Sequence, residues 1–278
     1  MSRVSQGSEV RRVVQERTNP DQMKHIRLLV VIASLTLTTS CGLLTHDAAD
    51  QPQTSTISAS TAPPSALESP DNLELQDQEG NSRLTPVSSS ETPTAARTIE
   101  LLSVQGRGPK TGYQRDLFGE AWDDGATGVL WSGNGCRTRD DILARDLDSV
   151  GKRDACVVIS GEYVDPYTNK QLQFTKKQAE ESPIDHIVPI SFAWQMGAAA
   201  WSTGKRLQFA NDPLNLVLTT KTANSAKGDS DPASWLPPNK AIRCAYVQRF
   251  AQVSLKYSMP VTPADKQIML DQCSSGGA

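Results

Sequence analysis

Histidine is scarce in this chain, with three copies among 278 residues. His25 and His46 lie in N-terminal segments whose composition differs from the rest, so His186 alone belongs to the part that carries the aromatic residues. A single histidine excludes zinc enzymes that need two histidines on one helix or three around the metal. A Ser-His-Asp triad needs only one histidine, but the GxSxG pattern that would identify its serine is missing.

Tryptophan and tyrosine are absent before Tyr113, and residues 42–96 are instead rich in Ser, Thr, Pro and Gln. That segment carries eight acidic residues and one basic residue, a net charge of −7. It cannot bury enough apolar surface to offset the entropy lost on ordering. We therefore predict a disordered acidic linker over 42–96 and one folded domain over 97–278.

Neither sign of charge dominates the predicted domain. From Arg97 onward there are 21 Lys and Arg against 20 Asp and Glu, so the linker sets the overall net charge of −3. The predicted domain has no strong basic run that would indicate a polyanionic substrate. The near balance of its positive and negative charges does not exclude such a substrate either.

Residues 23–41 have the three-part layout of a secretory signal: a basic region, an apolar run over 28–37, and small residues before Cys41. The apolar run is shorter than the roughly 20 residues of a membrane span. Residues 1–22 are polar and are unusual ahead of a signal. We therefore predict that translation begins at Met23 and that the protein is exported.

Cys41 follows small residues as in a bacterial lipobox, where the cysteine is acylated after cleavage. Thr38 departs from that pattern, since leucine is usual there. The alternative is an ordinary cleaved signal with a chance cysteine. With lipidation, the polar linker would tether the domain to a membrane; without it, the protein would be secreted.

An even number of further cysteines, Cys136, Cys156, Cys244 and Cys273, predicts two disulfides in an exported domain. Four cysteines allow three pairings, and we favour the two local ones, Cys136–Cys156 and Cys244–Cys273. A structural zinc site is the weaker alternative, because no two of them have CxxC spacing.

Local patterns predict a mixed α+β domain. The predicted helices are 138–147 with Thr138 as N-cap, 192–209 with a break near Gly204, 220–227, 241–257, and one capped by Thr262 that reaches Cys273. The predicted strands are 156–160 and 171–174, joined as a hairpin by a turn at 165–169, and the short apolar runs 184–188 and 214–218.

Polar residues follow His186 in a specific order. Over about forty residues the set consists of Asp185, His186, Asn215, Asn224 and Lys227. A bare Asp-His pair is more often part of a turn than of a catalytic site, whereas the complete set is a much stronger signal.

This set resembles the HNH (ββα-metal) nuclease motif, in particular the HNH domain of CRISPR effector nucleases. A longer pattern over about 113–273 resembles actinobacterial secreted HNH-family proteins related to the C-terminal domain of GmrSD restriction enzymes. It includes CRTRD at 136–140, FANDPLNL at 209–216, KGD at 227–229 and WLPP at 235–238. The resemblance implies a disulfide-stabilised α+β fold with a ββα-metal core, added helices and a β-hairpin.

The resemblance also implies roles for these residues. Asp185 and Asn224 would hold a divalent metal through oxygen atoms, and His186 would deprotonate water as general base. Asn215 would fix a loop before the metal-binding helix, and Lys227 would contact a phosphate or orient Asp185. Two oxygen ligands with open positions favour Mg²⁺, with Mn²⁺ as a substitute.

Adjacent side chains on a strand point to opposite faces, so a bulge or a strand end must bring Asp185 and His186 to one site. Asn224 stands where the classical motif has histidine, as in the CRISPR-type variant. Trp194, Trp201 and Trp235 are predicted to belong to the core, although base stacking is an alternative. Arg137 and Arg139 are phosphate contacts or a solvated helix start.

The sequence thus predicts a monomeric, exported endonuclease that hydrolyses phosphodiester bonds, with DNA favoured and RNA left open. One rival is a non-catalytic surface lipoprotein that binds a cell-wall or nucleic-acid partner. Another is a Ser-His-Asp hydrolase, which a metal chelator would leave active.

Overall fold

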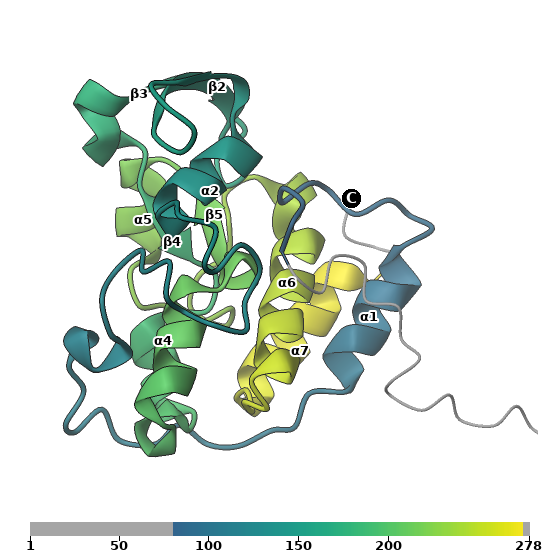
Figure 1. The fold of residues 1–278 in the computed structure, drawn as a ribbon. Coiled ribbons are helices and arrows are strands. Elements are labelled where there is room, and N and C mark those ends of the chain that lie inside the picture. Colours follow the sequence, from purple (N-terminus) through teal and green to yellow (C-terminus); the bar gives the residue numbers. More distant parts are fainter. Residues whose placement is uncertain (1–79, 275–278) are drawn as a thin grey trace, which may run out of the picture. The chain divides into compact units, whose positions relative to one another are not determined.

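The structure, a computed structural model, describes residues 80–274 (Figure 1). The predicted signal over 23–41 with Cys41, and residues 1–22, lie outside the described residues. The α-helices are α1 Thr92–Glu100, α2 Thr138–Asp146, α3 Ile190–Gln195, α4 Thr203–Asn211, α5 Lys221–Lys227, α6 Arg243–Lys256 and α7 Pro263–Cys273. The 3₁₀ helices are η2 Arg115–Phe118, η3 Lys176–Glu181, η4 Ala198–Ala200, η5 Pro213–Asn215 and η6 Lys240–Ile242. The strands are β1 Asp148–Lys152, β2 Val158–Val164, β3 Gln171–Thr175, β4 Ile184–His186 and β5 Leu216–Leu218.

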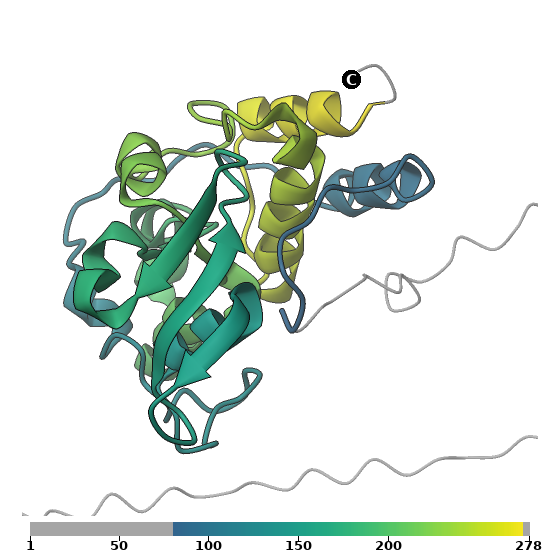
Figure 2. The ribbon, with the colours of Figure 1, turned by 90° about the horizontal axis from the view of Figure 1, so that it is seen from above.

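The predicted hairpin is present as strands β2 and β3, which pair antiparallel around the turn after Val164 (Figure 2). Their inward side chains, Val158, Tyr163 and Phe174, form a buried cluster with Ile142 and Leu143 of α2. Alternating burial along β2 explains why one face of the hairpin packs on this helix.

Strand β1 was not predicted from the sequence. Its residues are mostly polar and partly exposed, so its sequence shows no alternation of apolar and polar residues. It pairs with β2 through an irregular register. Gly161 allows the pairing, because a Cβ there would lie 2.9 Å from Cβ of Leu147 and 3.0 Å from the carbonyl oxygen of Asp148.

Strands β4 and β5 form a separate antiparallel pair, in which Ile184 faces Leu218 and His186 faces Leu216. Helix α5 follows directly, with the hydroxyl of Thr220 accepting a hydrogen bond from the amide of Ala223 as N-cap. The two expected strands and the expected helix are therefore present, although both strands are shorter than predicted.

Helices α1, α6 and α7 pack against one another on the far side of the domain from the hairpin (Figure 1). Thr262 and Asp265 form a reciprocal capping box at the start of α7, which confirms the predicted cap. Ala95 and Ile99 bury α1 against the main hydrophobic core. No helix among residues 80–274 is both long and apolar enough to cross a membrane.

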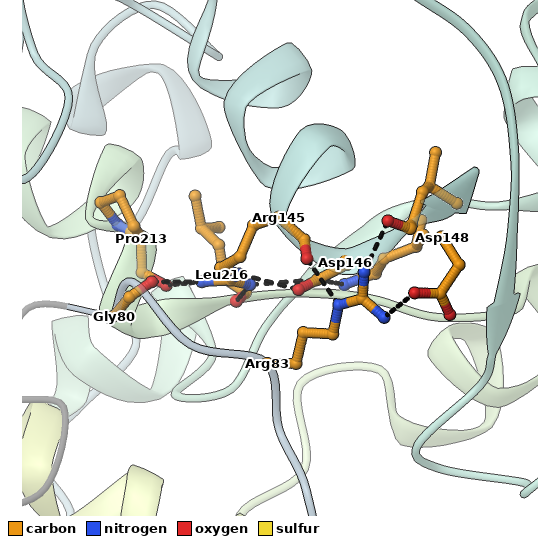
Figure 3. Close-up of polar contacts among 9 residues, drawn as sticks. Gly80, Arg83, Arg145, Asp146, Asp148, Pro213 and Leu216 are labelled. Atoms are coloured by element: carbon orange, nitrogen blue, oxygen red, sulfur yellow. Dashed lines mark hydrogen bonds and ion pairs between the residues drawn. The ribbon is translucent and has the colours of Figure 1, made fainter. Parts of the chain in front are cut away.

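The folded domain begins earlier than the predicted boundary at Arg97. Arg83 donates hydrogen bonds to the carbonyl oxygens of Arg145 (2.6 Å) and Leu147 (2.5 Å) and pairs with Asp148 at 2.8 Å (Figure 3). Arg145 in turn donates to the carbonyl oxygen of Gly80 at 2.7 Å. Composition alone could not reveal this boundary, because one arginine and a few buried side chains anchor an otherwise polar segment.

Two predicted helix details differ from the structure. The 192–209 helix is broken at Gly197, where φ is +120°, rather than at Gly204, which lies inside α4. Thr138 is the first helical residue of α2 instead of its N-cap. Its hydroxyl donates to the carbonyl oxygen of Asp123 at 3.3 Å, so a tertiary contact replaces the local cap.

Both favoured disulfides are formed. Cys136–Cys156 joins the loop just before α2 to the segment before β2, and Cys244–Cys273 joins α6 to the end of α7. The local pairing was the right one because each bridge links neighbouring elements that already pack together.

Candidate functional site

A polar cavity of about 230 Å³ lies at the end of β4. It is lined by Arg115, Ile184, Asp185, His186, Pro189, Ile190, Asn224, Gly228 and Asp229. Strand β4 ends at His186, so the chain leaves strand geometry immediately after the Asp-His pair. The strand end is what lets Asp185 and His186 line the same cavity.

His186 is fixed in its ring plane and in its tautomer. Its Nε2 lies 2.8 Å from the carbonyl oxygen of Ala210, which can only accept, so Nε2 carries the proton and Nδ1 keeps its lone pair. The Trp122 ring stacks on the imidazole at 6.4 Å with an interplanar angle of 17°. Both contacts hold the ring where Nδ1 can accept a proton.

The pKa of His186 is lowered to about 3, mainly by burial and to a smaller extent by the nearby charges of Arg115 and Lys227, while the bond to Ala210 opposes this shift. The imidazole is therefore neutral near neutral pH. A neutral ring with one unprotonated nitrogen is the form that a general base requires.

Asp185 is held by two side chains from distant parts of the chain. Lys227 Nζ lies 3.1 Å from Oδ1 and 3.0 Å from Oδ2, and the hydroxyl of Tyr167 donates to Oδ2 at 2.8 Å. Burial raises the pKa of Asp185, and the charge of Lys227 and the Tyr167 hydrogen bond work against that rise. The carboxylate is thus oriented by a buried cation and a buried hydroxyl.

Lys227 has no exposed side-chain surface. Besides Asp185, its Nζ donates to the carbonyl oxygen of His186 at 2.7 Å. Of the two roles that the sequence left open, this geometry favours orienting Asp185 over contacting a phosphate, because the ammonium is already enclosed by acceptors.

Asn215 clamps the bend that follows β4. Its Oδ1 accepts from the amide of Val188 at 2.8 Å, and its backbone carbonyl accepts from the amide of Ile187 at 2.8 Å. Its Nδ2 donates back to the carbonyl oxygen of Val188 at 3.3 Å. The loop that Asn215 fixes therefore lies between β4 and α3, not before α5 as the resemblance implied.

Asn224 lies on α5, and its side chain is partly exposed and borders the cavity beside Asp185. Asp229 follows the end of that helix and forms an exposed ion pair with Lys110 at 3.0 Å. Partial burial acts to raise the pKa of Asp229, but the hydrogen bond from Ser191 and the charge of Lys110 outweigh it, and the pKa is lowered.

The cavity offers the donor atoms that a hard divalent cation prefers. Asp185, Asn224 and Asp229, whose side chains carry such oxygens, all line it. Among residues 80–274, no group of three or more His, Cys, Asp or Glu side chains could hold a metal ion. Two carboxylates and an amide are ligands that suit a cation such as Mg²⁺, which keeps waters and takes few protein ligands.

Asp165 connects the hairpin turn to α5 without touching the cavity. This buried carboxylate accepts from the hydroxyls of Thr168 (2.6 Å), Thr219 (2.7 Å) and Thr220 (3.0 Å) and from the amide of Tyr167 (3.1 Å). It positions both the N-cap of α5 and the tyrosine that binds Asp185.

Four further residues belong to the surroundings of this site although no sequence pattern indicated them: Arg115, Trp122, Tyr167 and Asp229. Arg115 and Trp122 belong to the long loop between α1 and α2, where no periodicity singles them out. Tyr167 lies in a turn whose residues indicated only a change of direction. Asp229 was visible in the KGD sequence, but nothing local assigned it to the cavity.

Other candidates have structural contacts. Trp194, Trp201 and Trp235 are partly buried against the main core, which confirms their predicted place. Arg139 donates to two carbonyl oxygens, those of Ala179 at 3.1 Å and Ser182 at 3.0 Å. This geometry favours a structural role for Arg139 over a phosphate contact.

The fold and the site define a disulfide-bonded α+β domain with a histidine, a carboxylate and an amide around one polar cavity. Residues 137–272 match the family described as "GmrSD restriction endonucleases, C-terminal domain". An "uncharacterized secreted protein" of Arthroderma benhamiae is 37% identical over 194 residues, which cover 68% of this chain and 89% of the relative. No solved structure matches the chain.

The chain therefore belongs to the family of this secreted relative, and its residues 137–272 are similar to the C-terminal domain of the GmrSD restriction endonucleases. The matched range contains the five residues predicted from the sequence as the site, whereas Arg115 and Trp122 precede it.

Proposed function

We propose that this protein is an exported, metal-dependent HNH-type endonuclease that hydrolyses phosphodiester bonds, with DNA as its substrate. One observation carries the proposal: Asp185, His186 and Asn224 border a single polar cavity, and Lys227 and Tyr167 hold the carboxylate in place. The description of the matching family supports nuclease chemistry, and the secreted relative supports export.

In this proposal His186 activates the nucleophile. Nδ1 takes a proton from a water molecule, and the resulting hydroxide attacks phosphorus as the bond to the leaving oxygen breaks. The bond from Nε2 to the carbonyl oxygen of Ala210 keeps the ring in place throughout and stabilises the imidazolium that forms. The departing oxygen takes its proton from solvent.

Asp185 and Asn224 are the residues that would hold the divalent cation, Mg²⁺ or Mn²⁺ in its place. When bound, such a cation supplies neutralisation of charge on the scissile phosphate and its leaving oxygen. Lys227 and Tyr167 would keep Asp185 aimed at the cavity before any ligand arrives. Preorganised ligands of this kind need little rearrangement during the reaction.

A lipid on Cys41, which would anchor the protein to a membrane, and a monomeric state complete the proposal. Both concern properties that residues 80–274 do not address. Mass spectrometry of the mature N-terminus and light scattering of the purified protein would test them separately.

The decisive experiment uses residues 42–278, the mature chain without the lipid-bearing Cys41, made in an oxidising compartment. Plasmid, single-stranded DNA and RNA are incubated with Mg²⁺, Mn²⁺ or EDTA, and His186→Ala is compared with the wild type. We expect metal-dependent cleavage, abolished by EDTA and slowed about 10²- to 10⁴-fold in the variant. A folded wild type that leaves every nucleic acid intact with several divalent cations would overturn the proposal.

A further inference from the structure

Two cavities meet at His186, and Arg115 borders both of them. The first is the polar cavity with Asp185 and Asn224, of about 230 Å³. The second, of about 30 Å³, lies on the side of Trp122 and Ala210. Arg115 is thus the basic residue that borders the proposed general base on both sides, yet the resemblance assigned it no role.

The backbone that carries Arg115 is firmly held. Arg115 begins η2, whose last residue, Phe118, is buried against the rings of Trp194 and Phe209 at 6.4 and 6.1 Å. Arg206 Nε donates to the carbonyl oxygen of Leu117 at 2.8 Å. The exposed side chain of Arg115 therefore projects from a rigid base, so that ligand binding has to order the side chain alone and not the backbone that carries it.

The charges around the cavity leave that of Arg115 uncompensated. Lys227 neutralises Asp185, and Lys110 pairs with Asp229. Glu120 also borders the smaller cavity, but Arg115 takes part in no ion pair with any described residue, and its guanidinium donates a hydrogen bond to the Tyr113 hydroxyl. An uncompensated guanidinium at the edge of a polar cavity favours an anionic ligand.

We propose that Arg115 binds the scissile phosphate in the cavity beside His186, donating two guanidinium N–H groups to its non-bridging oxygens. This assignment rests on the proposed function. Bidentate donation suits arginine better than lysine, because the planar guanidinium matches the spacing of phosphate oxygens. The contact strengthens as negative charge accumulates on those oxygens in the transition state.

The kinetic test compares Arg115→Ala and Arg115→Lys with wild type in the mature chain. The matched control is Arg153→Ala, which removes an exposed arginine paired with Asp154 in the β1–β2 turn. We expect kcat to fall about 10²- to 10³-fold in Arg115→Ala, as for loss of one transition-state donor, and less in Arg115→Lys. Added guanidinium should partly restore Arg115→Ala alone, and the control should cleave at the wild-type rate.

A binding test separates this assignment from the proposed function. A fluorescein-labelled single-stranded DNA is titrated into His186→Ala with and without Arg115→Ala, in EDTA and at several salt concentrations. Loss of Arg115 should weaken binding and reduce the slope of log K against log salt by about one. Thermal unfolding checks that all variants are folded.

Equal cleavage and equal DNA binding by Arg115→Ala and Arg153→Ala would overturn the assignment. If the wild type proves inactive on every nucleic acid, the proposed function fails. In that case, DNA binding that weakens when Arg115 is replaced would still support a phosphate-binding site. DNA binding that does not depend on Arg115 would overturn the phosphate-binding site as well.

Discussion

Two regions of different construction meet at His186. One is the segment from β4 to α5, in which paired strands and buried polar side chains hold Asp185, Asn224 and Lys227. The other is the irregular loop between α1 and α2, which brings Arg115 and Trp122 to the same imidazole. The strand–helix segment carries the proposed chemistry, whereas the loop carries the proposed phosphate contact and the indole ring that stacks on the histidine.

The difference shows how a site can divide its tasks. Backbone pairing and a buried ion pair fix the strand–helix segment from within. The loop instead depends on contacts with other elements, such as the hydrogen bond from the amide of Asp123 to Oδ1 of Asn211 at 3.0 Å. Changes in the first region should therefore affect stability and activity together, whereas changes to Arg115 and Trp122 in the second should affect activity more than stability.

Lys227→Met should produce the largest effect, because it leaves the buried Asp185 carboxylate without its cation. We expect the free energy of unfolding to fall by about 3–5 kcal/mol and cleavage to be lost. Urea unfolding measures the first quantity. Lys221→Met on the same helix is the control, since its exposed pair with Glu181 at 3.1 Å should contribute less than about 1 kcal/mol.

The double variant Asp185→Asn/Lys227→Met sharpens this prediction. Removing both charges should recover much of the stability without recovering cleavage, because no unpaired charge remains buried. If the single variant is as stable as the control, the buried pair does not hold this region together.

Replacing Cys136 and Cys156 by serine should come next in size. The bridge joins the end of the irregular loop to the hairpin and closes a 20-residue separation, so its loss should cost about 3 kcal/mol. Thermal unfolding with and without a reductant is the measurement. Without reductant the variant keeps Cys244–Cys273, so its difference from the wild type reports the first bridge alone, whereas reduced wild type, which loses both bridges, should be less stable than the variant. A variant as stable as oxidised wild type would show that the loop needs no bridge.

Truncation tests how much residues 80–96 contribute to the stability of the domain, a contribution that should affect both regions equally. A chain that begins at Arg97 loses Arg83 and the buried Leu84, and burial of one leucine contributes about 2 kcal/mol. A chain that begins at Gly80 should be as stable as the mature chain. Equal unfolding midpoints for the two truncated chains would contradict the boundary placed at Gly80.

The smallest effect is expected for Trp122→Ala. Without the stacked indole the imidazole gains freedom, and kcat should fall about tenfold, which corresponds to about 1.4 kcal/mol. DNA binding should not change, and Trp122→Phe should retain most of the rate. A loss of DNA binding instead would show that Trp122 contacts the substrate rather than the histidine.

Features with local causes were predictable. The start of α7 follows from Thr262, Pro263 and Asp265, three neighbours that build the cap among themselves. The β2–β3 hairpin follows from alternating apolar residues on either side of a turn. Strand β1 escaped prediction because its pairing depends on the close approach that Gly161 permits, not on its own residues.

The position of the folded boundary escaped prediction for a related reason. Composition averages over many residues, whereas the contacts of Arg83 with Arg145 and Leu147 span more than sixty positions in the sequence. A polar segment that is tied down by one side chain has the composition of a linker.

By itself, the sequence determined the order of Asp185, His186, Asn215, Asn224 and Lys227, the local disulfide pairing and the Thr262 cap, because each depends on residue types at short or regular spacing. Only the tertiary structure decided which nitrogen of His186 keeps its lone pair, where Lys227 points and that Arg115 borders the cavity. Those properties depend on the Ala210 carbonyl, on the Tyr167 hydroxyl and on an irregular loop. Their approach to His186 and Asp185 results from packing of the whole domain, which no local pattern encodes.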